Sequence, residues 1–334
     1  MNDTGDAALM GEAIALAAAV RRQTSPNPWV GAVVVASGQS FGGATEPPGG
    51  AHAEVVALAA ARSAGAELRG ATLYVTLEPC SHHGRTPPCA EAIIEAGIGR
   101  VVVAVEDPDE RVAGRGIALL RAAGITVDVG VGADQVTTQL ESYFMHRRTG
   151  RPWVTLKLAA TLDGRTAAAD GTSKWITGAE ARADAHQLRA DHDAVLVGAG
   201  TVRADDPELT VRHVAGPDPL RVVLGTAPVG ARVLPALELQ GDPGHVLDEL
   251  GSRGVLSVLV EGGATVAHAF HAARLVNRYI LYLAPALMGG TDGSPLLNGP
   301  GAATIDEAWR GRLLGVRRLG DDLRVDLGPV SLNA

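Results

Sequence analysis

The sequence predicts an α/β fold divided into two domains. Short apolar runs rich in valine, leucine and isoleucine have the length of strands, and alanine-rich stretches with helical periodicity lie between them. Strands that alternate with helices in this way form sheets with parallel pairs. The length of 334 residues exceeds that of an average single domain, so two domains are expected.

The boundary between the domains is expected in the charged segment 146–153. This segment contains Gly150 and Pro152, residue types that interrupt helices and strands. It separates two parts of the chain that each contain a full alternation of apolar and alanine-rich segments. We therefore predict one domain over residues 1–148 and a second over residues 149–334.

The elements of the first domain follow from this alternation. Apolar runs rich in β-branched residues are expected strands, and alanine-rich stretches, several with glycine near their C-terminal ends, are expected helices. The expected strands are 29–36, 71–77, 100–106 and 125–130. The expected helices are 12–22, 53–65, 88–97 and 114–124.

The second domain repeats the pattern with fewer clear helices. Its expected strands are 153–159, 193–198, 220–225, 255–263, 278–285 and 323–328. Its expected helices are 178–190 and 264–274. The segment 240–246, which contains glycine and proline, is expected to be a surface loop.

Charge and composition exclude two classes of partner. The net charge is −8, aromatic residues make up 3% of the chain, and no basic run occurs, so a nucleic-acid partner is not expected. No apolar run reaches the ~18 residues that span a membrane. The N-terminal segment has acidic residues where a signal peptide needs basic ones, and we expect a cytoplasmic protein with no membrane partner.

The two cysteines of the chain, Cys80 and Cys89, are separated by eight residues. They could form a disulfide, belong separately to the core, or bind a metal ion. Sparse cysteine usage and a reducing cytoplasm argue against the disulfide. With His52 they would give a zinc ion three ligands and leave a fourth position for water. Glu54 need not be a ligand and is placed to take a proton from that water.

These residues match the signature of zinc-dependent nucleobase deaminases, which is H-x-E followed by P-C and a second cysteine. The usual gap between the cysteines is two residues, whereas here it is eight. Each part of this signature alone is weak evidence for a metal site, since a buried cysteine often acts only as a small apolar residue. Their coincidence, with His52 expected to open a helix and Cys80 to follow a strand, favours the metal site.

Longer motifs extend the pattern to most of the chain. The segments SPNPWVGAVVV, HAEVVAL, ATLYVTLEPCSHHGRTPPC and DPDERVAGRGI resemble the deaminase half of the bifunctional deaminase/reductase family of riboflavin biosynthesis. The segments LKLAATLDGRTA, SKWITG, DAVLVGAGTVRADDPELTVR and LVEGGATV resemble its reductase half. The resemblance implies a cytidine-deaminase-like three-layer domain followed by a dihydrofolate-reductase-like α/β domain.

The resemblance also implies a phosphorylated pyrimidine substrate, 2,5-diamino-6-(5-phosphoribosylamino)pyrimidin-4(3H)-one. Zinc would activate the attacking water, and Glu54 would protonate the leaving ammonia. Asn27 is in the position where the family holds the pyrimidine ring, and His82 and Arg85 are where it contacts the substrate and its phosphate. For His83 we expect a solvated loop position.

For the second domain the resemblance implies reduction of the ribosyl group to ribityl with NADPH. No arginine is clearly assigned to a 2′-phosphate, so the residues alone leave NADH open. The implied polar residues near hydride transfer are Lys157 and Asp205. The implied substrate contacts are Ser173, Arg189, Leu209, Arg212 and Glu261. The implied cofactor contacts are Ala159, Trp175, Thr201, Asp205, Thr226, Gly262 and Gly263.

Without the resemblance, Arg189 would be interpreted as an exposed helix residue and Trp175 as a core aromatic. Gly262 and Gly263 indicate a cofactor contact independently of the resemblance. They lie between an expected strand and an expected helix, and without a Cβ they let a diphosphate approach the backbone amides at the helix start. Strand edges that are expected to be exposed make a homodimer plausible.

The chain departs from the family at three places. Thr45 stands where the family often has histidine, so one phosphate contact is lost or supplied elsewhere. The motif DPDERVAG replaces a more usual Asp-Pro-Asn-Pro, and the segment 226–254 is short. Two alternatives stay open: a monofunctional zinc deaminase with an inactive second domain, and a binding protein that keeps the fold without chemistry.

Overall fold

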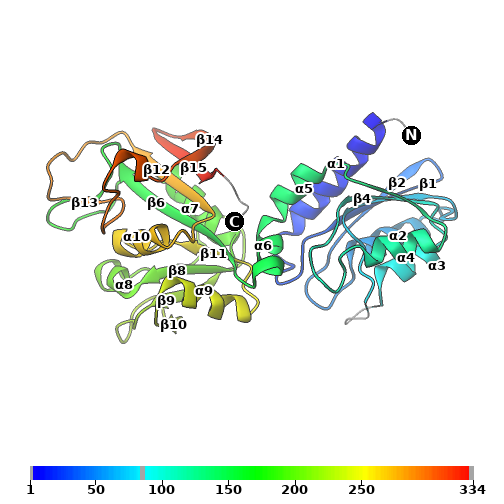
Figure 1. Cartoon of the computed structure of the whole chain (residues 1–334), viewed down its shortest axis with the longest axis horizontal. Coiled ribbons are helices and arrows are strands. Elements are labelled where there is room, and N and C mark those ends of the chain that lie inside the picture. The colour runs from blue at the N-terminus through cyan, green and yellow to red at the C-terminus, as the bar shows by residue number, and fades with distance from the viewer. Residues whose placement is uncertain (1–2, 83–86, 331–334) are drawn as a thin grey trace. The chain divides into compact units, whose positions relative to one another are not determined.

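The computed structural model describes residues 3–82 and 87–330, and the chain forms two compact units, Met1–Gly150 and Arg151–Ala334 (Figure 1). Both units are α/β, which confirms the predicted fold class. No helix in these described residues is long and apolar enough to cross a membrane.

The first unit is built on a five-stranded sheet in the order β2-β1-β3-β4-β5. Strand β1 pairs antiparallel with β2 and β3, whereas β3, β4 and β5 are mutually parallel. Every residue of the central strand β3 is buried. The strands are β1 (Gly31–Ala36), β2 (Gln39–Ala44), β3 (Thr72–Leu77), β4 (Arg100–Val105) and β5 (Thr126–Val129).

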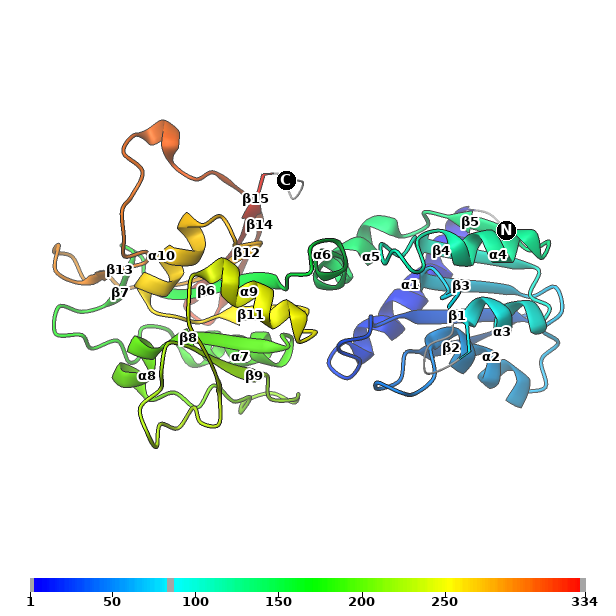
Figure 2. The same cartoon turned by 60° about the horizontal axis from the view of Figure 1, so that its bottom comes forward.

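Helices cover both faces of this sheet and make three layers (Figure 2). Glycines in the strands let two of the helices approach closely. A Cβ on Gly31 would lie 1.9 Å from the carbonyl oxygen of Ala13 in α1, and a Cβ on Gly43 would lie 2.4 Å from that of Ala53 in α2. Gly43 is next to Ala44, the partner of Gly31, so the two glycines face opposite sides. The helices are α1 (Asp3–Val20), α2 (Ala53–Ser63), α3 (Cys89–Glu95), α4 (Arg115–Ala122), α5 (Ala133–Gln139) and α6 (Glu141–Thr149).

The expected strands and helices of this unit are present with shifted ends, but β2, α5 and α6 are additions. The sequence of β2, QSFGGA, has two glycines and therefore low strand propensity. A two-residue turn with positive φ at Ser37 and Gly38 pairs it with β1. The last four residues of helix α6, 146–149, lie in the charged segment that we interpreted as the domain boundary.

The second unit is built on an eight-stranded sheet in the order β10-β9-β8-β11-β6-β12-β15-β14. In this order, every pair of neighbouring strands from β10 as far as β12 is parallel. The last two pairs, β12 with β15 and β15 with β14, are antiparallel. The strands are β6 (Trp153–Thr161), β8 (Ala194–Gly198), β9 (Leu220–Leu224), β10 (Leu237–Leu239), β11 (Ser257–Val260), β12 (Arg278–Ala284), β14 (Gly311–Leu319) and β15 (Asp322–Pro329). A two-stranded ribbon pairs β7 (Arg165–Ala167) with β13 (Ser294–Pro295).

Two apolar clusters occupy the two faces of the larger sheet. One contains residues of α9 and α10, such as Leu247 and Phe270, and the other contains residues of α7 and α8, such as Leu188 and Val202. The second unit therefore also has three layers. Its helices are α7 (Ala179–Ala190), α8 (Ala199–Asp205), α9 (Pro243–Ser252), α10 (Ala264–Ala272) and a short 3₁₀ helix, η1 (Ile305–Glu307).

The expectation of a surface loop over 240–246 is wrong from residue 243 onward, because α9 begins there. Asp242 caps this helix by accepting hydrogen bonds from the amides of Gly244 and His245, and Pro243 occupies the first helical position. The Asp-Pro pair was thus a helix-start signal that we interpreted as a loop signal.

We predict that Gly31→Ala lowers the free energy of unfolding by about 1–3 kcal/mol, because the added methyl group overlaps the backbone of α1. The matched control is Gly11→Ala, in α1 itself, where an added Cβ meets nothing within 4 Å. This control should be neutral or stabilising by up to ~1 kcal/mol. Urea unfolding followed by circular dichroism measures both, and equal effects of the two substitutions would contradict the packing argument.

Candidate active sites

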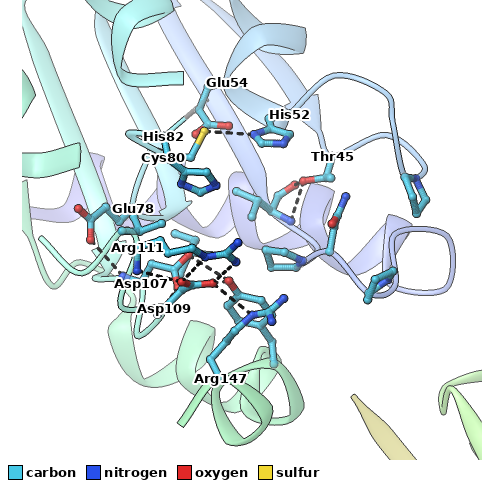
Figure 3. A pocket seen from close by; sticks show the side chains of 18 of the residues that line it. Thr45, His52, Glu54, Glu78, Cys80, His82, Asp107, Asp109, Arg111 and Arg147 are labelled. Atoms are coloured by element: carbon cyan, nitrogen blue, oxygen red, sulfur yellow. Dashed lines mark hydrogen bonds and ion pairs between the residues drawn. The ribbon is translucent and has the colours of Figure 1, made fainter. Parts of the chain in front are cut away.

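The three predicted metal ligands meet beyond the carboxyl end of β3, at the N-termini of α2 and α3. Figure 3 shows two of them, His52 and Cys80, with Glu54 beside them. His52 directly precedes α2, Cys80 follows β3, and Cys89 opens α3. His52 Nδ1 lies 3.2 Å from Cys89 Sγ and 3.5 Å from Cys80 Sγ, and all three ligand atoms lie within 4.8 Å of one another. Both cysteines are free, so the disulfide interpretation is wrong.

The two thiols are coupled through a hydrogen bond. The hydrogen bond from Cys89, assisted by one with His52, outweighs burial and lowers the pKa of the Cys80 thiol. The same bond between the thiols, together with burial, raises the pKa of Cys89. A divalent cation at this point would displace thiol protons and meet two thiolates and an imidazole, which is a donor set that zinc prefers. Within the described parts of the chain, this is the one such group of His, Cys, Asp and Glu side chains close enough to hold a metal ion.

Glu54 lies in the first turn of α2 beside the metal group and is only 4% exposed. Burial raises the pKa of its carboxyl to about 7, and the negative charge of Cys80 adds to this effect. A carboxyl group with a pKa near neutrality can both accept and return a proton. Glu54 therefore has the position and the protonation behaviour of a general acid and base.

A cavity of about 430 Å³ opens in front of the metal group, and Asn27 and His82 line it together with His52, Glu54 and Cys80. Two predicted positions, Arg85 and His83, lie outside the described residues. The cavity is thus lined by the described residues that we expected at the pyrimidine ring and at the metal, except Cys89. Cys89 does not line the cavity and is fully buried.

The opposite wall of this cavity consists of residues that were not predicted from the sequence: Asp107, Asp109, Arg111, Tyr143 and Arg147. The two aspartates follow the parallel strand β4, a position where ligand-contacting residues often lie. From the sequence, their motif, DPDERVAG, was identified only as a departure from the family pattern. Tyr143 and Arg147 come from α6, which was not predicted, and no local signal connects them to the zinc motif.

The second unit contains a cavity of about 650 Å³. It brings together ten of the residues predicted for the reductase, although they are spread over more than a hundred positions of the chain. These lining residues are Lys157, Ala159, Ser173, Trp175, Arg189, Thr201, Asp205, Leu209, Arg212 and Glu261.

A buried ion cluster lies at the centre of this cavity. Arg189 donates two hydrogen bonds to the Glu261 carboxylate, at 2.6 and 3.0 Å, and Lys157 Nζ lies 3.6 Å from the same group. Burial opposes ionisation of Glu261, but Arg189 and Lys157 outweigh it and lower its pKa to about 2. Lys157 on β6, Glu261 directly after β11 and Arg189 on α7 thus form one cluster with a net charge of +1.

The rim of the cavity carries exposed residues. Trp175 is 72% exposed, so the interpretation of this side chain as a core aromatic is wrong, and the Arg182 guanidinium lies 4.7 Å from its ring centre. Asp205 ends α8, and its carboxylate lies 3.7 Å from Lys174 Nζ. A flat aromatic face and an exposed ion pair at a cavity mouth are features that can contact a cofactor ring and its substituents.

Three predicted cofactor residues, Thr226, Gly262 and Gly263, are not among the residues that line this cavity. Thr226 accepts a hydrogen bond from the Gln240 side chain at the surface. The amide of Gly263 donates to the Thr201 hydroxyl at 3.0 Å. A Cβ on Gly262 would lie 2.7 Å from Val266, so packing of β11 against α10 by itself requires glycine there.

Comparison with known proteins identifies both halves. The family model of the cytidine and deoxycytidylate deaminase zinc-binding region matches residues 4–105. The family model of the RibD C-terminal domain matches residues 152–325. The chain is 43% identical to a riboflavin biosynthesis protein RibD from Bacillus amyloliquefaciens, with 96% of this chain and 95% of the relative covered. It is 46% identical to the RibD protein of Mycobacterium tuberculosis, with 95% and 96% covered.

Solved structures agree with this result. A RibD structure from Acinetobacter baumannii is 38% identical, with a TM-score of 0.92 over 99% of this chain and 100% of that one. A structure from Thermotoga maritima is 35% identical, with a TM-score of 0.90 over 98% and 99%, and is named a diaminohydroxyphosphoribosylaminopyrimidine deaminase/5-amino-6-(5-phosphoribosylamino)uracil reductase.

A zinc-binding deaminase unit followed by a reductase unit defines a bifunctional deaminase and reductase. The chain belongs to the RibD family of riboflavin biosynthesis enzymes. Its cofactors are zinc in the first unit, where the donor set fits that ion, and NADPH in the second. Neither the monofunctional alternative nor a binding protein without chemistry is favoured by these matches.

We predict that the purified protein contains about one zinc ion per chain and that Cys89→Ser removes both zinc and deamination, because a hydroxyl is a poor substitute for a thiolate. Glu54→Gln is the matched control, since it should retain zinc while deamination falls by about 10²–10⁴-fold. Elemental analysis and a deamination assay measure the two properties. Full deamination by metal-free protein would contradict the assignment.

Proposed function

We propose that the first unit deaminates the pyrimidine ring of 2,5-diamino-6-(5-phosphoribosylamino)pyrimidin-4(3H)-one and that the second reduces the ribosyl group of the product to ribityl phosphate. One observation carries this proposal: each unit has its own cavity with its own charged groups, a metal group with Glu54 in one and an ion cluster around Glu261 in the other. The name of the Thermotoga maritima relative describes the same two activities.

In the proposed deamination, Asn27 holds the pyrimidine ring with the carbon that bears the amino group toward His52, Cys80 and Cys89. Zinc, when bound, lowers the pKa of a water and so supplies the nucleophile. Glu54 accepts a proton from that water on its carboxylate and delivers it to the amino nitrogen, which leaves as ammonia. The pKa of Glu54, which burial raises to about 7, suits both transfers.

The proposed reduction adds a hydride and a proton to the ribosyl group. NADPH, when bound, supplies the hydride. We propose that Lys157 and Asp205 act near the transfer and that Glu261 and Arg189 hold Lys157 in place. The other proposed substrate contacts are Ser173, Leu209 and Arg212, with His82 and Arg85 in the deaminase unit. The proposed cofactor contacts are Ala159, Trp175, Thr201, Asp205, Thr226, Gly262 and Gly263.

We assign the deaminase to residues 1–148 and the reductase to residues 149–334, and we expect the two sites to act independently. Glu54→Gln should abolish only deamination, and Asp205→Asn only reduction. Neither variant alone should form the reduced, deaminated product. A 1:1 mixture of the two should form it, because the deaminated intermediate can diffuse from one chain to the other.

Product formation is followed by mass spectrometry with NADPH present. Recovery near half of the wild-type rate is the expected result. Absence of recovery, when each variant retains its other activity, would show that the sites are not independent. Failure of the wild-type protein to convert the pyrimidine at all would contradict the proposed substrate itself.

We also propose that the protein forms a homodimer through the edge strand β14. This strand ends the eight-stranded sheet, and its side chains Leu313, Leu314 and Val316 are 59%, 44% and 53% exposed. Adjacent apolar side chains on an edge strand favour pairing with another chain. A second copy can add its own β14 in the same way because a twofold axis makes the contact self-complementary.

Light scattering after size-exclusion chromatography tests the dimer. The wild-type protein should have about twice the chain mass of 34.2 kDa, and Val316→Lys should shift it toward the monomer. Leu287→Lys, at an apolar residue that is 74% exposed outside β14, is the control and should leave the mass unchanged. A monomeric wild-type protein would refute the proposal.

We place the protein in the cytoplasm, since its zinc group needs both cysteines reduced. Cell fractionation with detection of the chain in the soluble cytoplasmic fraction is the expected result. Recovery from a membrane or extracellular fraction would contradict this location.

A further inference from the structure

Thr45 stands in the deaminase cavity at the position where the family resemblance implies a histidine and one of the phosphate contacts. The Thr45 hydroxyl donates its single proton to the Val30 carbonyl oxygen, at 3.3 Å, and accepts a hydrogen bond from the Val30 amide, at 3.1 Å. The side chain is also only 4% exposed. Thr45 therefore has no donor left for a substrate phosphate, and any phosphate contact in addition to those proposed for His82 and Arg85 has to come from another residue.

Two guanidinium groups line the same cavity, those of Arg111 and Arg147, and no other lysine or arginine does so among the described lining residues. They lie on the side of the pocket away from His52 and Cys80 (Figure 3). In a phosphoribosyl substrate the phosphate is at the far end from the ring, so a ring held at the metal would extend its phosphate toward this side.

Asp109 holds the two arginines together. Arg111 donates two hydrogen bonds to its carboxylate, at 2.9 and 2.6 Å, whereas Arg147 Nε lies 3.6 Å away, an ion pair without a hydrogen bond. The hydrogen bonds from Arg111 lead the causes that lower the pKa of Asp109 to about 2, so this carboxylate stays charged. A charged carboxylate at this position would repel a phosphate unless more than one cation surrounds it.

Arg147 has an unused donor at the cavity wall. Its Nε is buried and has no hydrogen-bond acceptor, and the guanidinium is held in place over the Tyr143 ring, 4.9 Å from the ring centre. Tyr143 is itself fixed, because its hydroxyl bonds to Asp107 at 3.2 Å. A buried guanidinium donor without an acceptor is costly and indicates that an acceptor binds there.

We propose that Arg147, supported by Arg111, binds the phosphate of the deaminase substrate and takes over the role lost at Thr45. This inference rests on the proposed function of the first unit. The guanidinium plane of Arg147 meets the phosphate with two N–H groups, while Arg111 stays on Asp109 and neutralises it. Helix α6 thus contributes to specificity of the deaminase for a phosphorylated substrate.

The test compares deamination of the phosphorylated substrate with that of its dephosphorylated ribosyl analogue. Arg147→Gln should raise KM for the phosphorylated substrate about 10–100-fold, the loss expected for a charge-assisted hydrogen bond, and leave the analogue unchanged. Arg147→Lys should recover part of the lost affinity, since lysine keeps the positive charge but lacks the planar pair of N–H donors. Arg148→Gln is the matched control: it is the next residue of α6, its guanidinium lies over Phe144, and it does not line the cavity.

A double variant distinguishes direct binding of the phosphate by Arg147 from an indirect effect, in which Arg147 only neutralises the charge of Asp109. In an Asp109→Asn background, Arg147→Gln should still raise KM for the phosphorylated substrate if the contact is direct. Loss of its effect in that background would overturn the proposal, as would equal effects of Arg147→Gln on both substrates.

The proposed function can fail separately. If the wild-type protein deaminates neither compound, the function is wrong. If it deaminates both with equal KM, the function stands but the phosphate site does not exist.

Discussion

The alignment of parallel strands is the constraint on which both sites depend. Crossover connections between parallel strands bring the carboxyl ends of the strands to one edge of the sheet, and helices begin there. In the first unit Cys80 follows β3 and Asp109 follows β4, while His52 and Cys89 stand at helix starts beside them. In the second unit Glu261 follows β11 directly and meets residues from β6 and α7.

The two buried glutamates show how neighbours decide the chemistry of one residue type. Glu54 is buried beside the charge of Cys80, and both effects raise its pKa to about 7. The Glu261 side chain is also largely buried, at 7% exposed, but Arg189 and Lys157 overcome the effect of burial and lower its pKa to about 2. The first is suited to transfer protons, whereas the second is a fixed anion that orients two cations.

The zinc group could be predicted because its residues are closely spaced and because zinc demands particular ligands, so that His52, Cys80 and Cys89 define it almost alone. The α/β class followed from apolar periodicity. Arg147 and Asp109 could not be found, since α6 and the turn after β4 approach the zinc group only through folding. The packing role of Gly262 was likewise hidden, because its contact with Val266 depends on how β11 meets α10.

X-ray absorption at the zinc edge of the purified protein tests the central claim most directly, because it reports the atoms bound to the ion without reference to activity. The account predicts two sulfur neighbours at about 2.3 Å and two nitrogen or oxygen neighbours at about 2.0–2.1 Å, from Cys80, Cys89, His52 and one water. A shell without sulfur, or with four sulfurs, would contradict it.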